Sequence, residues 1–547
     1  MSEQKVNITD TSHLSSSIVK AQFITGERTN EMQVLSSAWN TGNCITGYDM
    51  VTALTQNTIN LQFSLLWMKL PSKYRKLELK STEKDPDLGE INFSFDGDMD
   101  APMVILGTSS DPHFNVKLSI NIPTGTLTYG VKNNSHKISN WKFVFDINVN
   151  FLEIEHERIQ NHMAIPDAVK DMLHEFDSDD FTIRHLFMNF EDAEIADFDP
   201  THSELPLPEG MSNLALNLFK LSLIDYFSKL ANTDHPYILG YSIEQKAPTP
   251  DPSSTPTFIP TSGTYWIFKE RDESQEYLST LNLLLTADGR PLPYPTEPNF
   301  NNNWLISNDC NGRFVLAKNL FFENHLLPKL KKALNTYVTG VVSKSGFESE
   351  YNLAQGIEWS LFESPENSNS DWTYIYEKTF NWSIGFSLKV EHSLKNNFWF
   401  TVYPEKLENK AAIKVNGGFC IDYQMKGTNP NMFQRDDISW SISTVEWNAT
   451  INVECGTHGV IKLEMSPEFN AQKFEGSIQY GVPLINALIT QITDSVKNAL
   501  ESEIRCLNNS LEAVGSRFVL PAGYMYAFKN PQFDSFQNLL FDMTIKS

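Results

Sequence analysis

The residue types that bind metals or transfer protons fall into three short clusters in this sequence. In the first, FDGDMDAP, Asp96, Asp98 and Asp100 have the spacing of a calcium-binding loop. Such a loop also needs glycine at its sixth position and glutamate at its twelfth. The sequence has Ala101 and Gly107 at these positions, so a structural turn is favoured and a calcium site is the alternative.

The second cluster, FLEIEHERIQNH, contains glutamates and histidines close together. If the segment is extended, Glu153, Glu155 and Glu157 share one face of a strand, and His156 lies on the other. His162 follows further along the chain. This spacing separates the candidate ligands, so we predict no metal site here.

The third cluster is acidic, with Asp177, Asp179 and Asp180 followed by more carboxylates at 191–194. We interpret it as a solvated face rather than a cation site. No catalytic motif accompanies the clusters, since the sequence lacks G-x-S-x-G, H-E-x-x-H and the phosphate-binding P-loop. We therefore predict a protein that is not an enzyme and holds no metal or cofactor; a hydrolase with a non-standard site is the least favoured function class.

One basic run, KLPSKYRKLELKSTEK, contrasts with these acidic segments. Lys73, Arg75 and Lys76 lie near its centre, directly after a stretch without charge. A solvated loop is the simpler interpretation. The alternative is a headgroup or membrane patch, because clustered cations attract phosphorylated lipid headgroups.

The overall composition narrows the function classes. The 547 residues carry a formal net charge of −24, which argues against binding nucleic acid, whose phosphates need lysine and arginine. No C-x-x-C pair occurs, so the sequence predicts neither a zinc ribbon nor a disulfide scaffold. The N-terminal residues lack the apolar core of a signal peptide, and no stretch is apolar enough to span a membrane. We expect a protein made in the cytoplasm, with any release following a route without a classical signal peptide.

Long segments of alternating polar and apolar residues dominate the chain. They lie at 114–122, 143–151, 382–390 and 445–455. Alternation over this length predicts half-buried antiparallel strands in large curved sheets. After Phe151 the alternation changes phase at Leu152, which predicts a bulge.

Helices are predicted at 50–68, 213–230, 313–335 and 483–511. In the first, Val51, Leu54, Leu61 and Leu65 recur at helical spacing, and Asp49 is placed to cap the helix start. This segment has no charged side chain on any face, which is unusual for a surface helix. Two proline-rich segments lie at 246–260 and 289–298. The first is interpreted as a linker or an exposed loop, and a domain boundary and a long hairpin tip are equally compatible with it.

Five segments, taken in order, resemble a known bacterial family. They are GYDMV followed by N-x-I-N-x-Q-F at 47–63, HPYILGYSI at 235–243, LNLLLTADGRPLP at 281–293, GRFVLAKNLFFENHLLPKL at 312–330 and FKNPQFDSFQNLLFDMTI at 528–545. The family is that of the clostridial forty-seven-kilodalton protein and its OrfX-type relatives, encoded beside botulinum neurotoxin genes and in insecticidal toxin clusters. The resemblance extends from about residue 43 to the C-terminus.

This resemblance implies the tubular lipid-binding (TULIP) fold, an α+β architecture. Long curved antiparallel sheets would wrap around long helices in an elongated molecule, leaving an apolar groove or tube. A wrapped helix has little surface in water, which would explain the charge-free segment. We expect an N-terminal extension at 1–40, an N-terminal TULIP-like subdomain at 41–235, and a C-terminal TULIP-like subdomain with proline-rich loops at 236–547.

The favoured function is a non-enzymatic accessory protein of a bacterial toxin gene cluster, of neurotoxin or insecticidal type, which binds a lipid or another hydrophobic ligand. Burial of the ligand would contribute about 0.8 kcal/mol per methylene. In the alternative, the same residues close a dry core without lipid, and the protein assembles with the toxin or with sibling accessory proteins. The expected lining is Val51, Leu54, Leu61, Leu65, Ile485, Leu488, Ile492 and Val496.

Overall fold

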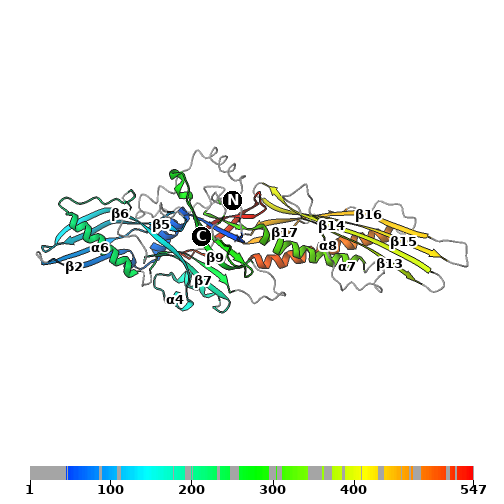
Figure 1. The fold of residues 1–547 in the computed structure, drawn as a ribbon, viewed down its shortest axis with the longest axis horizontal. Helices are drawn as coiled ribbons and strands as arrows, with labels where there is room; N and C mark the ends of the chain where they lie inside the picture. Colours follow the sequence, from blue (N-terminus) through cyan, green and yellow to red (C-terminus); the bar gives the residue numbers. More distant parts are fainter. Residues whose placement is uncertain are drawn as a thin grey trace, which may run out of the picture.

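The computed structural model describes residues 45–545, with gaps. The gaps longer than three residues are 108–112, 191–198, 231–234, 247–257, 299–303, 305–310, 343–359, 363–371, 385–388, 429–436, 472–481 and 513–517, and the side chains at 336–342, 360–362, 375–397, 406–407, 420–445, 482–489 and 491–492 are also outside the description. Figure 1 shows an elongated molecule with a sheet and helices at each end and a third sheet between them. The predicted fold class is confirmed: long curved antiparallel sheets pack on long helices.

An eight-stranded antiparallel sheet forms the N-terminal end. Its order is β19-β8-β7-β6-β5-β3-β2, with β4 also paired to β5. The strands are β2 (Lys76–Asp85), β3 (Gly89–Asp98), β4 (Met103–Leu106), β5 (Asn115–Tyr129), β6 (Asn134–Glu153), β7 (Phe181–Asn189), β8 (Ile238–Gln245) and β19 (Phe518–Val519).

Helix α6 (Asn213–Leu230) closes the inner face of this sheet. The ring of Phe219 lies 5.0 Å from Phe95, 5.2 Å from Trp141 and 4.9 Å from Phe143, measured between centroids. This aromatic cluster is the core of the N-terminal end. The helices α3 (Gln56–Lys69), α4 (His156–Asn161) and α5 (Asp167–His174) and the 3-10 helix η1 (Ser72–Tyr74) complete it.

A six-stranded antiparallel sheet occupies the middle and draws on remote parts of the chain. Its order is β20-β21-β11-β1-β10-β9. Every residue of β1 and β10 is buried, so both faces of this sheet are covered. The strands are β1 (Met50–Thr55), β9 (Pro260–Phe268), β10 (Thr280–Ala287), β11 (Gly312–Leu316), β20 (Tyr526–Phe533) and β21 (Leu539–Ile545), and the 3-10 helix η2 (Glu273–Leu278) precedes β10.

The helix predicted from residue 50 is therefore wrong in its first part. β1 runs between β10 and β11, and its residues alternately face two apolar cores, with Leu54 in one and Val51 in the other. A strand that is apolar on both faces imitates the pattern of a buried helix. The helix begins at Gln56, capped by Thr55, whose hydroxyl accepts a bond from the Thr58 amide.

Asp49, which we expected to cap the helix, has a different role. Its side chain is fully buried, accepts a bond from the Ala287 amide at 2.8 Å and pairs with Arg290. It stabilises the end of β10 instead of the helix start.

The absence of charge on α3 before its last residue, Lys69, follows from the surroundings of the helix. Gln56 accepts a bond from the Leu106 amide at 2.7 Å. Asn60 bonds both the amide and the carbonyl of Val104, at 2.6 and 3.0 Å. Strand β4 therefore covers the polar side of the helix, where a charged side chain would lose its water.

A seven-stranded antiparallel sheet forms the C-terminal end, in the order β12-β13-β14-β15-β16-β17 with β18 paired to β16. The π-helix η3 (Asn319–Leu326), α7 (Leu327–Val342) and α8 (Val482–Glu512) accompany it. The predicted helix at 483–511 is confirmed, and Asn508 bonds both backbone groups of Leu463 on β17. The strands are β12 (Ser360–Phe362), β13 (Trp372–Ile384), β14 (Lys389–Leu407), β15 (Lys410–Thr428), β16 (Asp437–Cys455), β17 (Ile461–Met465) and β18 (Asn470–Ala471).

Other predicted boundaries are corrected by the strand registers. The alternation at 382–390 spans a hairpin, since Ile384 pairs with Val390. The first residues of the helix predicted at 313–335 are β11. The predicted bulge after Phe151 is absent, because β6 pairs with β7 in unbroken register from Asn148 to Glu153; Leu152 is simply exposed.

The segment after Glu153 is also corrected, since it forms α4 and not a continued strand. Among the described residues, none of the helices combines the length and apolar character needed to cross a membrane. The subdomain boundary expected at residue 235 stays a prediction.

Candidate hydrophobic-ligand site

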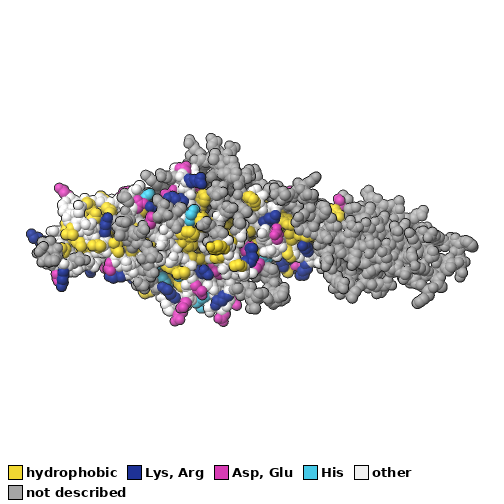
Figure 2. Space-filling model, viewed as in Figure 1, with side chains coloured by type: hydrophobic (Ala, Val, Ile, Leu, Met, Phe, Trp, Pro, Cys, Tyr) yellow, Lys and Arg dark blue, Asp and Glu magenta, His cyan; other side chains and the backbone are white. Residues whose placement is uncertain are grey.

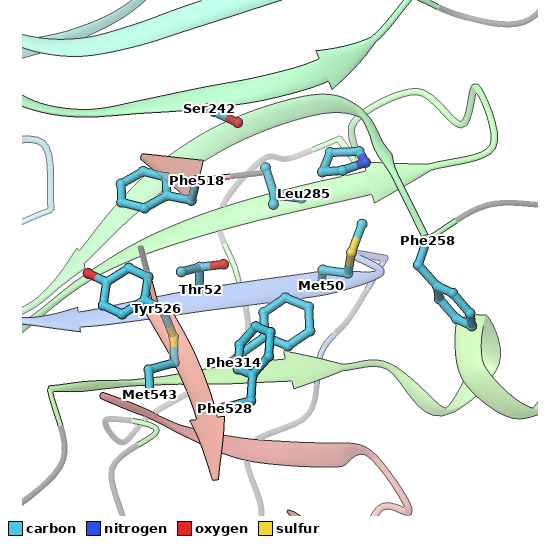
Figure 3. Close-up of a pocket in the computed structure, with 11 residues that line it drawn as sticks. Met50, Thr52, Ser242, Phe258, Leu285, Phe314, Phe518, Tyr526, Phe528 and Met543 are labelled. Carbon is cyan, nitrogen blue, oxygen red and sulfur yellow. The ribbon is translucent and has the colours of Figure 1, made fainter. Parts of the chain in front are cut away.

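A small apolar cavity lies where the six-stranded sheet meets β8 and β19 of the eight-stranded sheet (Figure 3). We call it the join cavity. It measures about 20 Å³, which is room for about one water molecule. The lining residues are Met50, Thr52, Ser242, Phe258, Pro260, Leu285, Phe314, Phe518, Tyr526, Phe528 and Met543.

Strand register places most of this lining on one face of the six-stranded sheet. Met50 pairs with Leu285 on β10, and Thr52 pairs with Phe314 on β11. Alternate residues of a strand share a face, so Met50 and Thr52 reach the cavity while Val51 faces the opposite side. The sheet thereby presents a continuous apolar surface.

Aromatic rings make up one wall of the cavity. The ring of Phe528 lies 5.2 Å from Phe314 and 5.6 Å from Phe541, between centroids. Phe518 stacks on Tyr526 at 6.3 Å. These separations are typical of favourable ring contacts, and the wall suits an apolar ligand.

The chain crosses between the two sheets at this wall. Phe518 belongs to β19, which pairs with β8, whereas Tyr526 begins β20 of the six-stranded sheet. A side chain at Gly240 of β8 would overlap the ring of Phe518. Glycine at this position therefore allows the ring to lie against the strand.

Tyr526 contributes a polar atom to this apolar site. The side chain is 4% exposed, and its hydroxyl has no hydrogen-bond partner among the described residues. Burial raises the pKa of Tyr526 well above its usual value of 10, so the hydroxyl keeps its proton. A buried group without a partner costs about 1–3 kcal/mol, and a ligand oxygen in the cavity would remove that cost.

We call the boundary between β8 and β9 the seam. A buried carboxyl group lies there, beside the join cavity. Glu244 is 2% exposed and lies 3.1 Å from Arg184. Gly263 of β9 approaches both Glu244 and the cavity residue Leu285. Burial raises the pKa of Glu244 to about 7, although the charge of Arg184 opposes this shift.

The structure separates the four lining residues that we predicted near the start of the chain. Val51 and Leu54 are fully buried on opposite faces of β1. Leu61 and Leu65 are half-buried on α3. None of them lines the join cavity, although Met50 and Thr52 beside them do.

The other four predicted residues lie on α8, which packs on α7 and β17 in the C-terminal part of the molecule, away from α3. Val496 is fully buried there. The side chains of Ile485, Leu488 and Ile492 lie outside the described residues. The two groups of predicted residues are therefore not brought together, and their contact with a ligand stays a prediction.

The basic patch lies at the start of β2. Lys73, Arg75 and Lys76 are all exposed. The ammonium of Lys73 lies 4.7 Å from the centroid of the Tyr74 ring and 3.7 Å from the sulfur of Met163. This patch is remote in sequence and in strand order from the join cavity.

Sequence reasoning missed the aromatic residues of the join cavity. MVTALT, LNLLLTA and LLFDMTI become β1, β10 and β21, and each is a short, nearly continuous apolar run. Such runs are typical of strands covered on both faces. Short apolar runs of this kind predict strands of a buried sheet. They do not predict that β1 lies in the same sheet as β20 and β21, because that arrangement depends on contacts between the two ends of the chain.

Comparisons with known proteins found similarity among solved structures. No family model and no curated protein matches the chain. P47 from Clostridium botulinum A2 is 12% identical with a TM-score of 0.46, covering 93% of this chain and 100% of P47. P47 of Clostridium botulinum E1 is 11% identical with a TM-score of 0.44, over 92% and 100% of the two chains. A lipopolysaccharide binding protein is 11% identical with a TM-score of 0.31, over 92% and 99%.

Proposed function

We propose that this protein binds a lipid or another hydrophobic ligand at the join cavity and acts, without catalysis, as an accessory to a bacterial toxin. The observation that carries the ligand proposal is the apolar cavity at the meeting of two sheets, with the buried hydroxyl of Tyr526 unpartnered. The accessory role is supported by the five sequence segments that resemble the toxin-cluster family.

The size of the cavity requires that it widen to accept an acyl chain. β8 and β9 belong to different sheets, so separating them at the seam breaks no ladder hydrogen bond between these strands. Tyr265 of β9 bonds the carbonyl of Val149, and the Ile267 amide bonds the carbonyl of His113 at 2.9 Å. These bonds tie β9 to β6 and to the chain before β5, and neither involves β8, so we expect the seam to open near Ser242.

The lining indicates the chemistry of the ligand. Each methylene that enters the cavity contributes about 0.8 kcal/mol to the free energy of binding, so a long acyl chain binds more tightly than a short one. A tyrosine hydroxyl donates to an oxygen acceptor. An acyl chain with an ester or carboxyl oxygen therefore fits better than a pure hydrocarbon.

The test is organic extraction of the purified protein followed by mass spectrometry. We expect a near-stoichiometric lipid from the native protein and from Leu284→Phe, and much less from Leu285→Phe. The matched pair adds the same volume to neighbouring buried positions of β10, but Leu285 lines the join cavity and Leu284 faces the opposite core. An empty extract from the native protein, or equal lipid in both variants, would overturn the proposal.

A separate screen tests the non-catalytic part of the proposal. We expect no turnover of esterase or glycosidase substrates above the level of an unrelated control protein. Turnover that persists through successive purification steps would show an enzyme.

A second candidate function is assembly with the toxin or with sibling accessory proteins. The outer face of α6 exposes Leu221 by 59% and Leu214 by 46%, and apolar side chains are visible at this end of the molecule in Figure 2. Exposed apolar side chains of this kind are typical of contact surfaces. Co-elution with co-expressed neighbours that is lost in Leu221→Glu, but kept in Lys229→Glu on the same helix, would favour assembly.

A further inference from the structure

A second cavity lies on the outer side of the eight-stranded sheet, between α4 and the ends of β6, β7 and β8. We call it the histidine cavity. It measures about 230 Å³ and is more polar than the join cavity. Its lining residues are Asn150, Leu152, Glu153, Ile154, Arg158, His162, His185, Phe187, Asn189, His235 and Ile238.

Three histidines from separate parts of the chain meet in this cavity. His162 follows α4, His185 lies on β7 and His235 precedes β8. His162 and His235 are 5% and 8% exposed, so they form the interior. Spacing along the chain could not predict this meeting, since the three histidines are far apart in sequence.

The backbone around two of these rings determines which nitrogen carries the proton. Nδ1 of His162 accepts a bond from the Ala164 amide at 3.2 Å, and Nδ1 of His235 accepts one from the Tyr237 amide at 3.3 Å. A neutral ring that accepts at Nδ1 has its proton on Nε2. Each of these two rings therefore carries an N–H donor on its other nitrogen.

The third ring has an unused nitrogen. Nδ1 of His185 is buried and has no hydrogen-bond partner in the part of the chain that the structure describes, while the ring also bonds the backbone of Leu152. The ring stacks on Phe187 at 4.4 Å between centroids. Stacking holds the imidazole in place, and its free nitrogen is available to a ligand.

The hydrogen-bond donors around the cavity suit an anion. Arg158 is exposed and lines the opening, where its guanidinium provides donors suited to oxyanions. Glu153 is the one carboxylate in the lining. Among the described residues, no group of three His, Cys, Asp or Glu side chains is placed to hold a metal ion.

We propose that the histidine cavity binds a phosphate-type oxyanion, held by the guanidinium of Arg158 and the N–H groups of His162, His185 and His235. A charge-assisted hydrogen bond to an anion is roughly twice as strong as a neutral one. The unpartnered nitrogen of His185 gains a partner when the anion binds and the ring is protonated.

The site couples anion binding to proton uptake. Burial lowers the pKa of His185 to about 4 and that of His235 to about 3, and Arg158 and His162 add to both shifts. An anion opposes these effects and raises both pKa values. The groups that face the rings are Glu153 from β6, Arg158 and His162 from α4 and its end, and Tyr237 from the chain beside His235.

Binding is therefore expected to tighten as pH falls. For one linked proton the affinity rises roughly tenfold per pH unit in the range between the free and bound pKa values. This inference does not rest on lipid binding, because the join cavity shares no lining residue with the histidine cavity.

The test is calorimetric titration of the full chain with sulfate at about pH 7.5 and about pH 5.5, at constant ionic strength. Sulfate keeps its charge over this range, so a change in affinity with pH arises from protonation of the protein and not of the anion. We expect clear tightening at the lower pH, lost in Arg158→Gln and kept in Arg505→Gln, an exposed helical arginine far from the cavity. Inorganic phosphate and glycerol phosphate, titrated in parallel, distinguish a free anion from a phosphate ester.

His185→Gln provides a second test through the proton linkage. We expect it to bind sulfate more weakly and to lose much of the pH dependence, and histidine ring NMR signals of the native protein should shift when sulfate binds. If His185→Gln does not fold, Arg158→Gln and the NMR signals still decide. Absence of binding at the lower pH, or equal binding by Arg158→Gln and Arg505→Gln, would overturn the proposal.

Discussion

Tyr526 stacks on Phe518 with 6.3 Å between ring centroids, and this contact joins the six-stranded sheet to a strand of the eight-stranded sheet. The hydroxyl of Tyr526 has no partner, whereas that of Tyr265 bonds the carbonyls of Val149 and Phe114. Two buried tyrosines at the same boundary thus differ in their hydrogen bonding, and the difference has measurable consequences.

In protein freed of any bound lipid, replacing Tyr526 with Phe is expected to raise the free energy of unfolding by about 1 kcal/mol, because a buried hydroxyl without a protein partner is removed. Tyr265→Phe, the matched control, is expected to lower it by a similar amount, since its partners lose a donor. Urea denaturation of both variants measures the effect. Equal destabilisation by the two substitutions would show that the hydroxyl of Tyr526 is satisfied in solution.

Glu244 is expected to make stability depend on pH near neutrality. Burial raises its pKa from 4.5 to about 7, so the folded protein holds this proton more tightly than the unfolded chain. The contribution of this protonation to the free energy of unfolding is fully present below about pH 4.5 and is lost as the pH rises to about 7. The native protein should lose this free energy of unfolding between about pH 4.5 and pH 7, whereas Glu244→Gln should not. The variant is therefore expected to become more stable relative to the native protein by up to about 3 kcal/mol over this pH range.

Denaturation at several pH values checks the Glu244 prediction. Glu90→Gln, an exposed glutamate of β3, is the control and should follow the native protein. A difference between Glu244→Gln and the native protein that stays constant with pH would mean that the carboxyl is ionised throughout.

His325 is expected to destabilise the protein in acid. It is 1% exposed, stacks on Phe258 at 4.0 Å, and burial lowers its pKa from 6.5 to about 4. The folded protein keeps the His325 ring neutral. The contribution of the neutral ring to the free energy of unfolding is therefore present above about pH 6.5 and is lost as the pH falls to about 4. That loss approaches about 3 kcal/mol for the native protein.

His325→Gln cannot bind this proton, so its stability should fall less between about pH 6.5 and pH 4. His113→Gln, at a partly exposed ring stacked on Trp266, is the comparison variant. Thermal unfolding in matched buffers gives the two slopes. If both variants lose stability as steeply as the native protein, His325 is already charged in the folded state.

The basic patch is expected to mediate weak contact with anionic membranes. Lys73, Arg75 and Lys76 are exposed, and Met163 beside Lys73 is 61% exposed, which combines charge with an apolar anchor. Cations near an anionic surface contribute about 1 kcal/mol each. Changing all three to Glu should abolish sedimentation with phosphatidylserine vesicles at low salt.

A charge-matched control separates this patch from net charge. Lys132, Lys137 and Lys142 lie on or beside β6 and are changed to Glu in the same way. This second variant should still sediment with the vesicles. Loss of binding in both variants would show that only total charge matters.

Local patterns predicted the kinds of elements well. Alternation at 445–455 became the end of β16, and the helical stripes at 213–230 and 483–511 became α6 and α8. These patterns arise because one face of each element is buried and the other is wet. The resemblance of five segments added the wrapped architecture, which the strand order confirms.

Residues 50–55 show where local reasoning fails. Their apolar positions satisfy helical and extended spacing equally, and the outcome is decided by β10 and β11 on either side. A strand that is buried on both faces lacks the alternation of polar and apolar residues by which a strand is recognised in sequence. The same cause made Asp49 resemble a helix cap, although it bonds the chain at Ala287.

The pattern of residues along the chain was enough to predict the long half-buried strands and the charge-free run at 50–68, and the family resemblance supplied the α+β class. Which residues line a cavity depends on how distant elements pack together. Met50, Phe314 and Met543 meet because β1, β11 and β21 are neighbours, and His162, His185 and His235 meet at the ends of β7 and β8. Periodicity records which face of an element is buried, but the partner that buries it is chosen by contacts between distant parts of the chain.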